Sequence, residues 1–150
     1  MSHFSAVEVD FLSKNESCLI EALEEMYGKG NIEHSADGLA LFGYGGDDRS
    51  KLDKNNPNYA PKCQIVIRRQ HVGGSSNDVG YCRTEDGKYK LYVSDFDQRS
   101  NFNAAKQKTV KQHYTASITK TQLRKQGYQV SMSHNKDGTL KILASKFSSK

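Results

Sequence analysis

Residues 63–69 read Cys-Gln-Ile-Val-Ile-Arg-Arg and contain the densest run of β-branched residues in this chain of 150 residues. Such residues fit a pleated, mostly buried strand. Two more strand-like segments follow closely, at residues 78–83 and 89–94. We interpret the three segments as a meander at the centre of one sheet, on which the rest of the chain packs.

The chain before this meander predicts one strand and one helix. Apolar and acidic residues alternate over residues 7–11, as they do in a half-buried strand. Ser13 and Glu16 have the spacing of a capping box, in which each side chain satisfies a backbone N–H of the other residue. Apolar residues recur at helical spacing over residues 18–27, and Gly28 ends the pattern. We therefore expect an amphipathic helix whose acidic face is solvated.

The connecting segments are predicted from their turn residues. Asp37-Gly38 is a hairpin signal, and we interpret residues 39–44 as a strand after it. Residues 45–62 form a long polar loop, which we expect to be mobile. Residues 70–77 include Gly-Gly-Ser-Ser and predict a flexible hairpin tip.

The C-terminal third predicts a long helix followed by a hairpin. The helix covers residues 104–126, with Asn101 or Asn103 as its N-cap. Residues 128–134 and 139–144 alternate between apolar and polar side chains, as two paired strands do.

The order of these elements decides the fold class, because strands interrupted by only two helices argue against a doubly wound parallel sheet. We predict a single α+β domain over residues 1–150. Its elements are a strand, a helix, a possible hairpin, the three-strand meander, the long helix and the C-terminal hairpin. The sheet is mostly antiparallel, with the two helices on one face. The predicted core consists of Val7, Val9, Leu19, Leu23, Ile65, Ile67, Val79, Leu91, Val93, Tyr114, Ile118 and Ile142.

Charge is distributed unevenly along the chain. The sequence has 22 Lys and Arg against 17 Asp and Glu, which gives a net charge of +5. Residues 98–150 contain 11 of these basic residues and a single acidic residue, Asp137. Such asymmetry indicates an anionic partner for the C-terminal part.

The predicted binding surface is centred on the long helix. Lys and Arg side chains on one surface bind the phosphates of RNA or DNA, and aromatic rings on an open sheet face stack on bases. The candidate stacking residues are Tyr81 and Tyr92. The candidate residues for binding nucleic acid or an acidic partner are Arg68, Arg69, Lys106, Lys108, Lys111, His113, Lys120, Arg124 and Lys125.

Two partners besides nucleic acid would also account for the basic residues. The long helix would contact either an acidic protein or the chain's own first helix, whose acidic face carries Glu21, Glu24 and Glu25. Loss of binding with salt separates phosphate contacts from hydrophobic docking of a protein.

No catalytic, metal or cofactor motif stands out, so we expect a non-catalytic binding or accessory module without a cofactor. The alternative is a small enzyme of unknown reaction, for which Asp78, Asp95 and His113 are the best set of titratable residues. The carboxylates of Asp78 and Asp95 are better explained as caps of the turns at the ends of the meander.

Three features predict a cytoplasmic protein with reduced thiols. Cys18, Cys63 and Cys82 are widely spaced without a C-x-x-C motif, and we expect all three to be free and buried. The N-terminal residues lack the basic and apolar layout of a secretory signal. No apolar run approaches the roughly 20 residues that span a membrane.

Several short pieces of the chain resemble a known family in their order and spacing. These pieces are residues 19–23, Gly43-Tyr44, residues 65–68, residues 78–81, Tyr92-Val93 with Asp95, Gln112 with Tyr114, residues 126–128 and Asp137-Gly138. Together they resemble the hypothetical chloroplast reading frame 35 family, also called domain of unknown function 1257. That family is found in cyanobacteria, algal plastids and some cyanobacterial phages.

The resemblance implies no known activity, cofactor or catalytic residue. Family members are often associated with AAA-type ATPase genes, so the resemblance implies such an ATPase as an alternative partner, with this chain as its adaptor. It also implies the cyanobacterial cytosol, or the plastid stroma for relatives, as the location. The chain departs from the family pattern in having no Trp and a purely basic long helix, which suits a phage-borne member.

Overall fold

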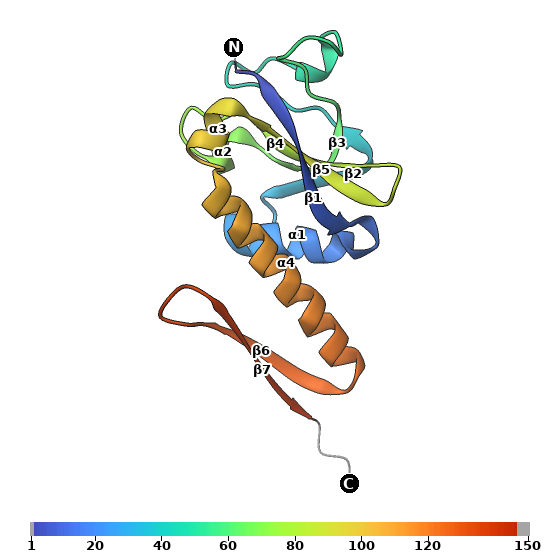
Figure 1. Cartoon of the computed structure of the whole chain (residues 1–150), viewed down its shortest axis with the longest axis vertical. Helices are drawn as coiled ribbons and strands as arrows, with labels where there is room; N and C mark the ends of the chain where they lie inside the picture. Colours follow the sequence, from blue (N-terminus) through green and yellow to red (C-terminus); the bar gives the residue numbers. More distant parts are fainter. Residues whose placement is uncertain (1, 147–150) are drawn as a thin grey trace.

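The computed structural model describes residues 2–146 and has an α+β architecture, as the sequence predicts. Five antiparallel strands form the main sheet in the order β1-β5-β4-β3-β2 (Figure 1). The strands are β1 (Phe4–Leu12), β2 (Ile32–Leu39), β3 (Cys63–Ile67), β4 (Val79–Arg83) and β5 (Lys88–Ser94). The predicted meander is therefore the centre of the sheet, and β3 has a neighbour on each side.

Two long helices, α1 (Glu16–Tyr27) and α4 (Ala104–Lys125), pack on one face of this sheet. Two short helices, α2 (Arg69–Val72) and α3 (Asp95–Arg99), lie together at one end of it (Figure 1). The Asn103 side chain caps α4 by accepting a hydrogen bond from the Lys106 N–H at 3.0 Å. No described helix is long and apolar enough to cross a membrane.

The main core lies between the sheet and the two long helices. Ile65 and Ile67 of β3 point into it, and Leu19 and Leu23 of α1 meet them there. Tyr114 attaches α4 to β1, because its hydroxyl accepts a hydrogen bond from the Leu12 N–H at 3.0 Å. Most of the predicted core is buried, while Val7, Val9 and Ile118 are only partly buried against it.

The opposite face of the sheet is covered by the segment between β2 and β3. Leu41 and Ala60 of this segment pack on Val66 in a second, smaller apolar cluster. The buried Arg49 side chain ties the segment together, donating hydrogen bonds to the carbonyl oxygens of Ser2 and Asn58 at 2.7 and 2.9 Å. The predicted mobility of residues 45–62 stays a prediction.

The predicted hairpin at Asp37-Gly38 is wrong. Strand β2 runs through both residues, and its pairing with β3 shifts register between His34 and Leu39. Gly38 has a φ of 90°, a conformation that glycine supplies in bulges as well as in turns. Of the predicted strand over residues 39–44, Leu39 is the last residue of β2, and Phe42 forms one isolated bridge with Asp48.

The predicted capping box is also wrong. Residues Ser13–Asn15 form a 3-10 turn before α1, and no described side chain caps that helix. The Glu16 carboxylate turns instead to the sheet, where it accepts hydrogen bonds from Arg83 at 2.8 Å and from the Tyr89 hydroxyl. A tertiary ion pair has therefore replaced the local cap.

The connection between β3 and β4 differs from the simple tip that its Gly and Ser residues predict. It contains helix α2, and Ser76 and Asn77 near its end are buried. The Asn77 N–H donates to the buried carboxylate of Asp97 in α3 at 3.0 Å. The connection is therefore packed into the domain.

The C-terminal hairpin of β6 (Tyr128–His134) and β7 (Leu140–Lys146) forms a separate two-stranded sheet (Figure 1). It packs against α4, which runs past the main sheet to reach it. None of the described residues from 126 onward is buried. Ile142 is only half-buried because one helix alone covers the hairpin, so its place in the predicted core is wrong.

Candidate functional site

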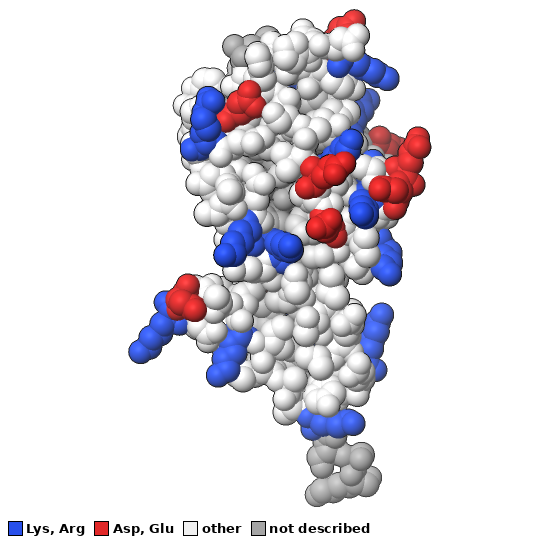
Figure 2. Space-filling model, viewed as in Figure 1, with Lys and Arg blue, Asp and Glu red and all other residues white. Residues whose placement is uncertain are grey.

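The predicted basic surface lies on α4 and the β6–β7 hairpin, residues 104–146, which we call the basic arm. Figure 2 shows Lys and Arg side chains over this lower part of the molecule, whereas acidic side chains gather on the upper part. Asp137, in the hairpin turn, is the only acidic residue of the arm. Five predicted contact residues of the arm are exposed: Lys106, Lys108, Lys111, Arg124 and Lys125.

A groove runs between α4 and β7 beside these cations. Its volume is about 540 Å³, and Lys108 and Lys111 line it from the helix. Leu140 and Ile142 line it from the hairpin. The groove therefore combines apolar side chains with two ammonium groups.

His113 and Lys120 belong to the same helix but are compensated inside the chain. The His113 ring nitrogen Nδ1 lies 2.7 Å from a carboxylate oxygen of Glu25, and the Lys120 ammonium contacts Glu21. Both basic side chains are only 12 % exposed. The acidic face of α1 therefore contacts α4 through these two glutamates, whose side chains still remain 40 % and 34 % exposed for Glu21 and Glu25.

We predict that Lys120→Glu lowers the free energy of unfolding by at least about 1 kcal/mol, the upper range for a partly exposed ion pair. The change removes the pair and places a third carboxylate beside Glu21 and Glu25. The matched control is Arg124→Glu, which reverses an exposed charge one helical turn further along and should cost less than about 0.5 kcal/mol. Urea unfolding of the two variants checks the difference, and equal losses would contradict it.

Arg68 lies apart from the basic arm and clamps the end of β3. Its guanidinium donates to the Asp78 carboxylate at 2.8 Å, to Glu33 at 3.0 Å and to the Ala40 carbonyl oxygen at 2.7 Å. Burial by itself would lower the pKa of Arg68, but the hydrogen bonds to Glu33 and Asp78 outweigh it and raise that pKa. Arg68 is therefore held in place by the chain's own carboxylates.

Arg69, the next residue, is partly buried and begins α2. Its backbone N–H donates to the other oxygen of the Asp78 carboxylate at 2.7 Å. The contact of Arg68 and Arg69 with Asp78 is not predicted from the sequence, because the connection between these residues is expected to be flexible.

The two tyrosines predicted to stack on bases differ in position. Tyr81 is 1 % exposed and faces the main core, where its ring centroid lies 5.9 Å from that of Phe11. The prediction of an open sheet face at Tyr81 is therefore wrong. Tyr92 is half-buried on the other face, against the second apolar cluster.

Within residues 2–146, no hydrogen bond or ion pair joins any two residues of the enzyme alternative. Asp78 binds Arg68, and Asp95 accepts a hydrogen bond from the Ser5 hydroxyl at 3.0 Å. His113 pairs with a glutamate of α1. Each of the three side chains thus has a separate structural partner.

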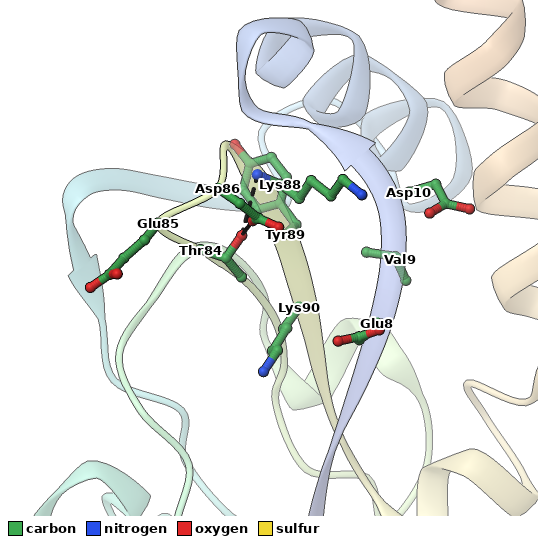
Figure 3. Close-up of a pocket in the computed structure, with 9 residues that line it drawn as sticks. All are labelled: Glu8, Val9, Asp10, Thr84, Glu85, Asp86, Lys88, Tyr89 and Lys90. Carbon is green, nitrogen blue, oxygen red and sulfur yellow. Dashed lines mark hydrogen bonds between the residues drawn. The ribbon is translucent and has the colours of Figure 1, made fainter.

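A second pocket lies where the β4–β5 turn meets β1 (Figure 3). Its volume is about 410 Å³, and both carboxylates and ammonium groups line it. Glu8 of β1 lies directly across from Lys90 of β5. A hydrogen bond from Thr84 lowers the pKa of Asp86 in the turn. Within residues 2–146 no three His, Cys, Asp or Glu side chains are placed to hold a metal ion, and the mixed charges favour no ligand.

Comparison with known proteins identifies the family. The family described as "Protein of unknown function (DUF1257)" matches residues 46–143. The chain belongs to this family. The DUF1257 match includes β3, β4, β5, α4 and most of the hairpin, and therefore nearly the whole basic arm. No curated protein and no solved structure matches the chain.

Proposed function

We propose that this DUF1257 protein is a non-catalytic binding module whose basic arm holds the phosphate backbone of a nucleic acid. One observation carries the proposal. Within residues 2–146, none of the five exposed cations of α4 forms an ion pair with an acidic side chain. Unpaired like charges on one helix repel each other, and a polyanion compensates them while releasing its own counterions.

The dimensions of the arm support contact with several phosphates. Helix α4 has 22 residues, which corresponds to a length of about 33 Å. One turn of a nucleic-acid duplex is about as long, roughly 34 Å. The cations that remain unpaired stand near both ends of the helix, at Lys106, Lys108 and Lys111 and at Arg124 and Lys125.

Recognition by the arm should be independent of sequence. Tyr81 is buried, so it offers no ring on which a base could stack. Lysine ammonium groups contact phosphates as point charges and carry no sequence information. The proposal therefore covers RNA and DNA alike, and it includes a location in the cytoplasm, where free thiols persist.

We predict that the double variant Lys108→Glu/Lys111→Glu binds a short RNA or DNA duplex more weakly and with less dependence on salt. Each lost phosphate contact reduces the slope of log affinity against log salt by about 0.9, so the slope should fall by about two. Fluorescence anisotropy between about 50 and 200 mM salt measures both quantities.

The matched control is Lys51→Glu/Lys54→Glu. It reverses two exposed lysines with the same spacing of three residues, outside the arm. Its slope should equal that of the wild type. Equal slopes for all three proteins, or no binding by the wild type at low salt, would rule out nucleic acid as the partner.

The groove favours a second candidate, an adaptor function for an acidic protein, of which an AAA-type ATPase is one example. Leu140 and Ile142 would take apolar side chains of such a partner, and Lys108 and Lys111 would pair with its carboxylates. A synthetic acidic peptide with leucine anchors tests this candidate. The adaptor is supported, instead of the nucleic-acid module, if the wild type binds the peptide but no duplex and if Ile142→Asp abolishes binding of the peptide.

A further inference from the structure

Two of the three cysteines lie side by side on the face of the sheet opposite α1 and α4. Cys63 begins β3 and is fully buried, and Cys82 lies near the end of β4 and is partly exposed. Both belong to the second apolar cluster, with Leu41 and Val66. The sequence predicts three separate buried thiols, and this expectation is wrong for Cys82.

The two cysteines lie just beyond Ile65 and Tyr81, where the regular pairing of β3 with β4 ends. The Gln64 side chain accepts the Arg83 N–H at 2.8 Å, a bond that a regular ladder would give to a backbone carbonyl. The Cys63 thiol lies 3.6 Å from the Pro61 carbonyl oxygen and the Cys82 thiol 3.3 Å from that of Lys62, the residue before Cys63, and each thiol shifts the pKa of the other.

Atoms of Gly80 and Lys62 lie close to the two thiols. A side chain at Gly80 would place its Cβ 2.7 Å from the Cys63 sulfur, so only glycine leaves room for that thiol. The Cys82 sulfur lies 3.3 Å from the Lys62 carbonyl oxygen. Adjacent strands lie about 4.8 Å apart, within the range that a disulfide can bridge.

The two thiols have different chemical roles. Cys82 is the more exposed of the two thiols, and Cys63 is buried. The neighbouring Cys63 thiol lowers the pKa of Cys82 to about 7, and burial acts against this change. The Cys82 thiol and burial both raise the pKa of Cys63. Exposure and a lowered pKa together make Cys82 the nucleophile, and the buried Cys63 is the thiol for a second step.

We propose that Cys63 and Cys82 form an oxidisable dithiol site that reacts with hydroperoxides and closes to a reversible disulfide. In the first step the Cys82 thiolate attacks the outer oxygen of the peroxide, the O–O bond breaks, and the alcohol or water leaves with a proton. In the second step Cys63 attacks the sulfur of the resulting sulfenic acid, an S–S bond forms, and water leaves. The two thiols lose two electrons, which reduce the peroxide, and a small dithiol reverses the change.

Treatment of the whole chain with hydrogen peroxide tests this proposal. Peptide mapping by mass spectrometry after alkylation should find one intramolecular link between Cys63 and Cys82. Cys18, a buried thiol on the other face of the sheet, serves as the internal control and should stay free. Dithiothreitol should restore all three thiols.

Three variants separate the two steps. Cys82→Ser should slow consumption of peroxide by roughly tenfold or more, because the thiolate is the nucleophile. Cys63→Ala should stop at the sulfenic acid, which dimedone traps on Cys82. Cys18→Ser should react as the wild type does.

The mapping of the wild-type protein decides the matter even if a variant fails to fold. Three results would each overturn the proposal. They are oxidation of Cys18 as fast as that of Cys82, disulfides that join two molecules, and the absence of a Cys63–Cys82 disulfide after peroxide treatment. The outcome is independent of what the basic arm binds, because the dithiol lies outside the arm.

Discussion

Asp78→Ala is expected to lower the free energy of unfolding by about 3–5 kcal/mol, the range for breaking a buried ion pair. The carboxylate is 1 % exposed and accepts hydrogen bonds from the N–H groups of Phe42 and Arg69 at 2.8 and 2.7 Å. It also pairs with Arg68 at 2.8 Å. Alanine leaves both N–H groups without their acceptor and removes one of the two carboxylates that balance the guanidinium.

Urea unfolding followed by circular dichroism measures the loss. Glu85→Ala is the control, because Glu85 is an exposed carboxylate in the β4–β5 turn and its removal should cost less than about 0.5 kcal/mol. Asp78→Asn keeps the shape but not the charge, and should fall between the two. A loss of less than about 1 kcal/mol for Asp78→Ala would show that the clamp is not a main support of the fold.

Ile67→Ala is expected to cost about 2–5 kcal/mol, the range for emptying a well-packed core site of this size. Ile67 is fully buried, with Ile32 of β2 on one side and Val79 of β4 on the other. Helices α1 and α4 close the cluster above it. The cavity left by the missing atoms therefore has rigid walls that cannot collapse into it.

Ile142→Ala is the matched control, since it removes the same atoms from a half-buried position on the hairpin. We expect a loss below about 1.5 kcal/mol there, because water already reaches the site. Equal losses at the two positions would mean that the hairpin has a core of its own. A small loss at Ile67 would instead mean that β3 has the opposite register.

Several of the pieces that carry the family resemblance pack on one another. Residues 65–68 and 78–81 supply both sides of the Arg68–Asp78 clamp. Gly80 makes room for the thiol of Cys63, and Gly43 makes room for the guanidinium of Arg49, whose nitrogen atoms would lie 2.7 Å from an added Cβ. These residues therefore have structural roles, and the proposed binding function rests on the arm instead.

Local patterns were sufficient for most of the fold. The β-branched run predicts β3, the alternating segments predict β1, β5 and the hairpin, and the Asn103 cap predicts the start of α4. Such patterns work because the period of the side chains follows directly from the geometry of strand or helix. The basic character of the arm is likewise a property of composition.

Only the tertiary structure decided which charges are free and which are compensated. Glu21 and Lys120 are 99 residues apart and meet only because α1 and α4 pack side by side. Arg68 and Asp78 meet because the strands that they flank, β3 and β4, pair with each other, and the same pairing brings Cys63 near Cys82. The amino-acid composition gives the number of charged groups and thiols but does not show which of them have a partner. Their roles differ because folding buries some of them, and a buried charge or thiol must find its partner inside the protein.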